Sequence, residues 1–170
     1  GRMSVPALKA PFQYFGGKSR IASVVWERFG NTQNYVEPFA GSLAVLLARP
    51  HPPGIETVSD RDGLLCNFWR AVQAAPEEVA HYADWIVHEC DLHARHLWLV
   101  RRKAELQARL EGDPEYYESK AAGWWVWGIC AWIGGGWCSG RGPWTVAEVD
   151  GVQQCVRAEN TGMGVNKKRP

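Results

Sequence analysis

The sequence predicts an α/β fold in which a small sheet comes first and a mainly helical region follows. The apolar run Tyr35-Val36 leads into a turn at Gly41, and a second apolar run ends at Asp60, nineteen residues after that glycine. Strand, glycine turn, helix and acid-ended strand follow one another in this order in doubly wound sheets that bind nucleotides. Beyond Gly63 the apolar residues recur at helical spacing. This order favours a ligand site where the first strands end, although an ordinary turn glycine and a solvated or capping aspartate give the same pattern.

Length and composition favour one globular domain. The chain has 170 residues, of which 46% are hydrophobic and 22% are charged. No apolar run reaches the ~18 residues that a membrane span needs, and no signal peptide opens the chain, so we expect a cytoplasmic protein without a membrane partner. The five cysteines form no C-x-x-C pair, which argues against a disulfide framework and a zinc ribbon.

Charge is divided unevenly along the chain. Residues 1–34 carry a net charge of +4, residues 35–119 carry −6 and residues 120–170 carry +3. Basic terminal segments suit a polyanionic partner, although a scatter of solvated charges gives the same totals.

The first glycine-rich segment is Tyr14-Phe15-Gly16-Gly17-Lys18. It precedes a predicted helix with apolar residues at positions 21, 24, 25 and 29. The glycine pair permits positive φ, and a lysine at such a helix start can hold an anion. An ordinary loop before a helix can have the same composition.

The second segment runs from Tyr35 to Ser42, and Asp60 follows it at the end of the next apolar run. Backbone at Gly41 can approach a ligand without a side-chain clash, and the Asp60 carboxylate can accept two hydroxyl hydrogen bonds. Asp62 is a good N-cap candidate, which leaves Asp60 free for another task. The helix after Asp62 is expected to bury Leu64, Leu65, Phe68, Trp69 and Val72.

A long acidic helical section is predicted from Pro76 until Gly112-Asp113-Pro114 stops it. Within it, His88, Cys90, His93 and His96 suggest a metal site, but the histidines lack the i, i+4 spacing of a helical zinc pair. A solvated histidine-rich face and no metal are therefore expected.

Tryptophan and glycine dominate the next region, since six of the ten tryptophans lie between positions 124 and 144. A helix there can bury positions 124, 125, 128, 129 and 132. The glycine-rich stretch after it is expected to be a mobile loop, with Trp137, Arg141 and Trp144 available for stacking or phosphate contact. The chain ends in the basic residues Lys167, Lys168 and Arg169.

Taken together, three blocks resemble the Dam-like family of DNA adenine methylases, which transfer a methyl group from S-adenosylmethionine to the N6 amino group of adenine. Tyr14-Phe15-Gly16-Gly17-Lys18 is similar to the aromatic-x-G-G-K opening of that family. Tyr35 to Ser42 is similar to its V-E-P-F-x-G block, and Val58-Ser59-Asp60 to its second acidic strand end. One departure is Gly41-Ser42-Leu43, where many members have G-x-G.

The resemblance implies a partial Rossmann-like, S-adenosylmethionine-dependent methyltransferase sheet with a mainly helical target-recognition insertion. Residues 4–75 would bind the cofactor, residues 76–165 would recognise the target, and residues 166–170 would form a basic tail. Double-stranded DNA with an adenine-containing site would be the partner, contacted by Trp137, Arg141, Lys167, Lys168 and Arg169. The residues that the resemblance assigns to S-adenosylmethionine are Tyr14, Gly17, Lys18, Glu37, Phe39, Gly41 and Asp60.

The D-P-P-Y block, with which the family positions the target adenine, is absent from the sequence, so no catalytic residue is assigned. Asp113-Pro114-Glu115-Tyr116 matches in part, but we interpret it as the end of one helix and the start of another. The sequence thus predicts an adenine-N6 DNA methyltransferase that is incomplete and inactive alone, with the block supplied by a longer frame or a partner chain. The alternatives are a non-catalytic DNA-binding or regulatory protein and a methyltransferase that acts on RNA or a small molecule.

Overall fold

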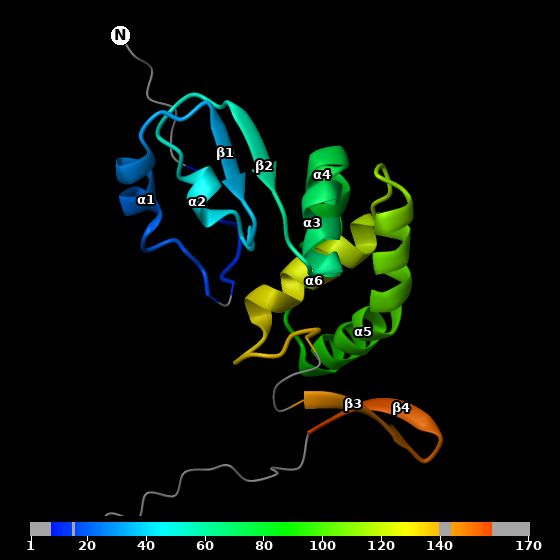
Figure 1. The fold of residues 1–170 in the computed structure, drawn as a ribbon. Coiled ribbons are helices and arrows are strands. Elements are labelled where there is room, and N and C mark those ends of the chain that lie inside the picture. Colours follow the sequence, from blue (N-terminus) through cyan, green and yellow to red (C-terminus); the bar gives the residue numbers. More distant parts are fainter. Residues whose placement is uncertain (1–7, 15, 140–143, 158–170) are drawn as a thin grey trace, which may run out of the picture.

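The computed structural model describes residues 8–14, 16–139 and 144–157, in which helices and strands mix as an α/β fold requires. In chain order the elements are α1 (Ala22–Phe29), β1 (Asn34–Glu37), α2 (Ala44–Leu47), β2 (Ile55–Val58), α3 (Gly63–Ala74), α4 (Pro76–Ala83), α5 (Glu89–Gly112), α6 (Ser119–Ala131), β3 (Trp144–Val149) and β4 (Val152–Arg157). Figure 1 shows α1 and α2 beside the β1–β2 sheet, the helices α3 to α6 next to it, and the β3–β4 hairpin apart from that sheet. None of the helices in the described ranges combines the length and the apolarity that crossing a membrane requires.

The first two strands form a parallel pair, with register from Asn34 opposite Ile55 to Glu37 opposite Val58. Both strands expected from the sequence are thereby confirmed. Tyr35 and Glu37 are buried, and the Tyr35 ring lies 4.8 Å from that of Trp26 on α1. Because parallel strands end at the same edge of a sheet, the turns that follow β1 and β2 lie together.

The helix α1 forms where it was predicted, but it buries a different face. Ile21, Val24 and Phe29 are 52%, 50% and 54% exposed, whereas Ala22 and Trp26 are buried. The Trp26 indole N–H donates to the Val45 carbonyl at 2.6 Å, and the helix turns its largest side chain toward α2 and β1. Of the face predicted at positions 21, 24, 25 and 29, only Val25 packs against this core, so the prediction is wrong at the other three positions.

The core is formed mainly by α3, α5 and α6. The predicted apolar face of α3 is confirmed, since Leu64, Leu65 and Phe68 are buried. Asp62 is also confirmed as its N-cap, because the side chain accepts the Leu64 N–H at 3.1 Å. On α6, Trp125 is 1% exposed and lies against Phe68 at 5.6 Å between ring centroids.

Two polar side chains of α3 fix the loop between α5 and α6. Fully buried Asn67 donates to the Glu118 carbonyl at 2.9 Å and accepts the Glu118 N–H at 2.8 Å. Arg70 donates from Nη1 to the carbonyls of Asp113 at 2.9 Å and Tyr116 at 3.2 Å. The D-P-E-Y stretch is thus a turn between two helices, as interpreted from the sequence.

The acidic helical section is interrupted, and the single helix expected from residue 76 to 112 is wrong. α4 ends at Ala83 and α5 begins at Glu89. The Trp85 carbonyl accepts the Trp127 indole N–H at 3.0 Å, a tertiary bond that replaces a helical one. The next two residues, Ile86 and Val87, are β-branched and exposed, which lowers the helix propensity of the segment.

The histidine-rich face is not uniformly solvated, contrary to expectation. His96 is 2% exposed and stacks on the Trp132 ring at 5.0 Å with an interplanar angle of 10°. Its Nδ1 accepts the Cys138 N–H at 3.3 Å. Burial, and then the neighbouring His93, lower the pKa of His96.

Acidification is therefore expected to destabilise the fold through His96. Its pKa in the folded chain lies below the unfolded value of about 6.5, so the unfolded chain takes up a proton first as the pH falls. His96→Gln, which keeps an acceptor but cannot titrate, should lose less unfolding free energy between pH 7 and pH 5 in urea denaturation than the wild type. Exposed His81→Gln is the control. Equal losses for the wild type and His96→Gln would contradict this assignment.

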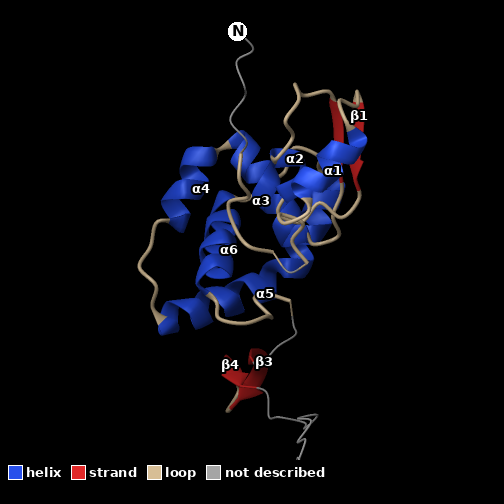
Figure 2. Ribbon diagram, turned by 90° about the vertical axis from the view of Figure 1, so that its left-hand side faces the viewer, coloured by secondary structure: helices blue, strands red, loops and turns tan. Residues whose placement is uncertain are grey.

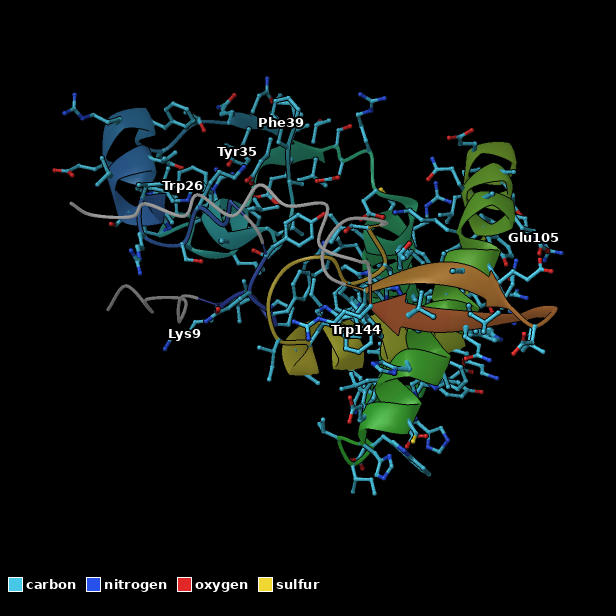
Figure 3. The ribbon with its side chains drawn as sticks, turned by 90° about the horizontal axis from the view of Figure 1, so that it is seen from below. Lys9, Trp26, Tyr35, Phe39, Glu105 and Trp144 are labelled. Carbon is cyan, nitrogen blue, oxygen red and sulfur yellow. The ribbon has the colours of Figure 1, made fainter. Side chains whose placement is uncertain are left out.

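An antiparallel hairpin, β3–β4, ends the described residues and was not predicted. Its turn is Asp150-Gly151, with φ of +51° and +76°. Aspartate-glycine between alternating residues is a strong hairpin signal that the sequence carried. Figure 2 shows the hairpin below the helices, and Figure 3 shows it lying against α5. There Arg101 Nε donates to Gln153 Oε1 at 2.8 Å.

Candidate functional site

A cavity of about 370 Å³ opens where β1 and β2 end. It is bordered by the segment before α1, the turn after β1 and the residue two positions beyond β2. Of the residues that the sequence assigned to a cofactor, all but Glu37 line it, namely Tyr14, Gly17, Lys18, Phe39, Gly41 and Asp60. The volume is in the range of small-molecule sites. The fold therefore brings together three segments that are distant in the sequence.

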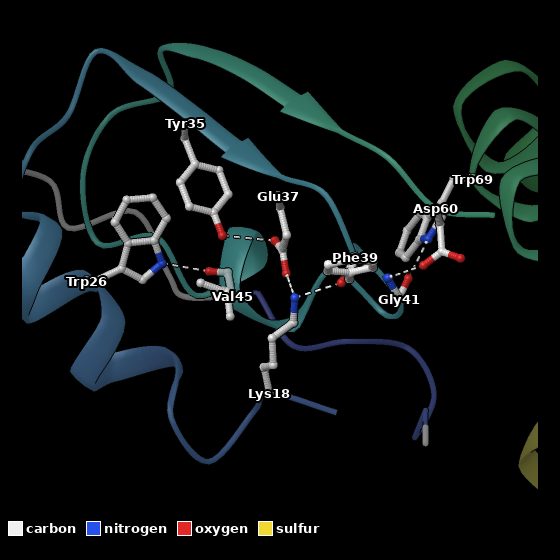
Figure 4. Close-up of polar contacts among 9 residues, drawn as sticks. All are labelled: Lys18, Trp26, Tyr35, Glu37, Phe39, Gly41, Val45, Asp60 and Trp69. Carbon is white, nitrogen blue, oxygen red and sulfur yellow. Dashed lines mark hydrogen bonds and ion pairs between the residues drawn. The ribbon is translucent and has the colours of Figure 1, made fainter. Parts of the chain in front are cut away.

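The buried carboxylate of Glu37 positions Lys18 at the cavity. Lys18 Nζ lies 2.5 Å from Glu37 Oε1 and donates to the Phe39 carbonyl at 2.7 Å (Figure 4). Glu37 is 3% exposed, and its Oε2 accepts the Tyr35 hydroxyl at 3.0 Å. Burial, followed by this hydrogen bond, raises the pKa of Tyr35, so the phenol stays protonated and donates. Glu37 is thus the buried ion-pair partner of Lys18 and does not itself line the cavity.

The turn after β1 favours glycine at position 41. Gly41 has a φ of +53°, and a Cβ built there would lie 3.0 Å from Tyr14 Cδ1. Its N–H donates to Asp60 Oδ2 at 3.0 Å, and its carbonyl accepts the Trp69 indole N–H at 3.1 Å (Figure 4). The Gly41 backbone, which was expected to lie close to a ligand, thus lies close to the ring of Tyr14.

Tyr14 forms another wall of the cavity. The Gly17 N–H donates to the Tyr14 carbonyl at 2.8 Å, and a Cβ on Gly17 would lie 2.8 Å from that oxygen, so the turn requires glycine. Burial, then the charges of Asp62 and Asp60, raise the pKa of Tyr14 to about 12. At neutral pH this phenol is a hydrogen-bond donor and not a base.

From the sequence, Asp60 was expected to be free for another task, but in the structure its carboxylate already accepts hydrogen bonds from two backbone N–H groups. Oδ2 accepts the Gly41 N–H at 3.0 Å and Oδ1 accepts the Asp62 N–H at 3.1 Å. A carboxylate has about four acceptor positions, so each oxygen keeps capacity for a ligand hydroxyl. With Lys18 on one wall and Asp60 on another, the cavity suits a ligand that carries both an anionic group and hydroxyl groups.

Trp69 supports the cavity from outside its lining, a role that sequence reasoning missed. Its spacing on α3 identified it only as part of an apolar face. The hydrogen bond from its indole to Gly41 crosses 28 positions of the chain. No local pattern in the sequence indicates such a bond.

The residues predicted to contact nucleic acid are not assembled by the described part of the structure. Arg141, Lys167, Lys168 and Arg169 lie outside the described residues. Trp137 is described, and it is 8% exposed, with its indole N–H donating to the Trp125 carbonyl at 3.0 Å. The expectation of an exposed Trp137 ring is corrected, because that ring packs between α6 and His96.

Comparison with known families gives a match. The sequence model of the family described as D12 class N6 adenine-specific DNA methyltransferase matches residues 14–117. No curated protein and no solved structure matches the chain. The matched range contains every residue that lines the cavity together with α3, α4 and α5.

Proposed function

The chain belongs to the D12 class of N6 adenine-specific DNA methyltransferases, and we propose from this premise that its cavity at the ends of β1 and β2 binds S-adenosylmethionine. The class acts on adenine in DNA, and its members generally use this cofactor. When bound, S-adenosylmethionine supplies the methyl group. The observation that carries the proposal is the convergence of Tyr14, Lys18, Gly41 and Asp60 on one cavity.

The residues fit this cofactor in charge and shape. Lys18, held by Glu37 and the Phe39 carbonyl, would bind the carboxylate of the methionine part. Asp60 would accept the ribose hydroxyls with the acceptor capacity that its two backbone hydrogen bonds leave. Phe39 is 76% exposed at the cavity and would cover an apolar part of the ligand. Burial of that ring by a ligand would itself favour binding.

We propose a Rossmann-like arrangement for the cofactor-binding part, residues 4–75. The parallel pair β1–β2 with α1 and α2 beside it supports this assignment. Residues 76–165 are proposed to recognise double-stranded DNA, and residues 166–170 to form a basic tail. Arg141, Lys167, Lys168 and Arg169 are the proposed phosphate contacts; buried Trp137 is not among them. Their effect on DNA affinity should depend on salt.

We propose that the 170-residue chain binds the donor but does not transfer its methyl group alone. Its sequence contains no D-P-P-Y, and none of the residues at the cavity is assigned to hold the adenine amino group. Positioning of the reacting atoms is a large part of catalysis in such reactions. A longer frame or a partner chain would supply the missing block.

Transfer of tritium-labelled methyl from S-adenosylmethionine tests this function. The chain alone should label duplex DNA no more than buffer does, whereas a chain extended by an apolar strand that ends in D-P-P-Y should label adenine N6. The matched control replaces the aspartate and tyrosine of that block with alanine. Labelling of DNA by the unextended chain would contradict the requirement for the block. Labelling of RNA in place of DNA by the extended chain would contradict the assignment of DNA as the substrate.

A second candidate is a non-catalytic DNA-binding or regulatory protein, which the net charge of +3 over residues 120–170 suits. It predicts DNA binding that weakens with salt and that S-adenosylmethionine does not change. DNA affinity that is independent of salt would contradict it.

A further inference from the structure

The backbone of Gly41 is held at its N–H and at its carbonyl by residues that follow β2. Asp60 accepts the N–H at 3.0 Å, and Trp69 on α3 donates to the carbonyl at 3.1 Å. We propose that Trp69 is a positioning residue, which fixes the turn at Gly41 so that the cavity is preformed before a ligand binds. The proposal rests on the proposed function only for the identity of that ligand.

The backbone of Gly41 needs both partners because it is buried in a tight turn. Gly41 and Leu43 have φ of +53° and +55°, and both are buried. A buried carbonyl without a donor is unfavourable, and a non-glycine residue at positive φ, such as Leu43, persists only when its surroundings hold it. The Gly41 carbonyl belongs to the peptide that joins residues 41 and 42, and the Gly41 N–H to the peptide that joins residues 40 and 41. Without the Trp69 N–H, the first of these peptides loses its donor, and relaxation of the turn around Gly41 weakens the hydrogen bond from the second to Asp60.

Trp69 is suited to this task because it is anchored on a helix and not on a loop. Its ring lies 5.0 Å from the Phe68 ring and 6.1 Å from the Phe12 ring, between centroids. On the same helix, Asn67 bonds Glu118, the N-cap residue of α6, and Asp62 caps the helix itself. The indole N–H therefore holds a fixed position relative to the core, and a rigid donor can fix a mobile turn.

Trp69 affects ligand binding indirectly, through Asp60 and Tyr14. Gly41 lies against the Tyr14 ring, and its N–H occupies one acceptor position of the Asp60 carboxylate. Movement of the Gly41 backbone would displace the Tyr14 ring or release the Asp60 carboxylate, and both of these residues line the cavity. Trp69, which is not among the cavity-lining residues, acts through these groups.

Trp69→Phe removes the N–H and keeps an aromatic ring against Phe12 and Phe68. In the ligand-free chain, hydrogen exchange of the Gly41 amide should be about tenfold faster, with the α6 amides unchanged. The Kd for S-adenosylmethionine, by calorimetry, should rise about 5–10-fold, as expected for one lost hydrogen bond. Trp98→Phe is the matched control, because Trp98 is also half-buried but contacts Trp124, Arg102 and Lys120. That variant should change neither quantity.

Unchanged Gly41 exchange in Trp69→Phe overturns the proposal, and so does faster exchange that extends equally over α3 and α6. The second outcome would mean that Trp69 only stabilises the fold. If the variant does not fold, slow exchange of the Trp69 indole N–H in the wild type supports the bond, and fast exchange overturns it. If the wild type binds no S-adenosylmethionine, the proposed function fails, while the exchange rates still decide the role of Trp69.

Discussion

Asp60→Ala is expected to raise the Kd for S-adenosylmethionine about 100-fold. The substitution removes the proposed acceptor of the ribose hydroxyls, and hydrogen bonds to a charged group contribute roughly 1.5–3 kcal/mol each. It also removes the acceptor of the Gly41 and Asp62 N–H groups, so the turn that shapes the cavity is loosened. Isothermal titration of the purified variant against the wild type measures the effect.

Glu148→Ala is the control for Asp60→Ala, because it removes the same charge from an exposed position on β3. It should leave the Kd unchanged within twofold. Circular dichroism must show that Asp60→Ala remains folded. A folded Asp60→Ala protein that binds the cofactor as tightly as the wild type would exclude Asp60 from the site.

Trp125→Ala is expected to lower the free energy of unfolding by about 4 kcal/mol, the usual loss for a large aromatic residue in a core. Trp125 is 1% exposed, and its ring lies 5.1 Å from the Phe12 ring and 5.6 Å from the Phe68 ring. Loss of the indole would leave a cavity between α6, α3 and the segment that leads to Tyr14, and would remove the packing contacts among them. Urea denaturation followed by circular dichroism provides the measurement.

Trp85→Ala serves as the comparison, since Trp85 is 56% exposed in the segment between α4 and α5. Its side chain bonds Asp91 and contacts Arg95, so a loss of about 1 kcal/mol is expected. If Trp125→Ala were no more destabilising than Trp85→Ala, the core described around α3 and α6 would be wrong.

The composition of the cavity could be predicted because local chemistry dictates it. Gly17 and Gly41 occupy turns that a Cβ would crowd, and Asp60 lies two residues beyond β2, at the edge where the parallel strands end. Such residues are conspicuous in a sequence. The role of Glu37 as the buried partner of Lys18 was not predicted, because it depends on which face of β1 lies under α1 and α2.

Long-range contacts explain what sequence reasoning missed in the helical region. The Trp85 carbonyl bonds a tryptophan 42 residues away, where the predicted long helix is interrupted. His96 is buried by Trp132 and Trp137, and neither neighbour follows from helical spacing. The Asp150-Gly151 hairpin, by contrast, is marked in the sequence by a local signal, because Asp-Gly favours a tight hairpin turn.

The central claim is that the cavity formed by Tyr14, Lys18, Gly41 and Asp60 binds S-adenosylmethionine. Calorimetric titration of the folded, wild-type chain with this cofactor tests it most directly. We expect saturable binding with one site per chain, in the absence of DNA and of any D-P-P-Y segment. A chain that is folded by circular dichroism and yet shows no binding at millimolar S-adenosylmethionine would contradict the account.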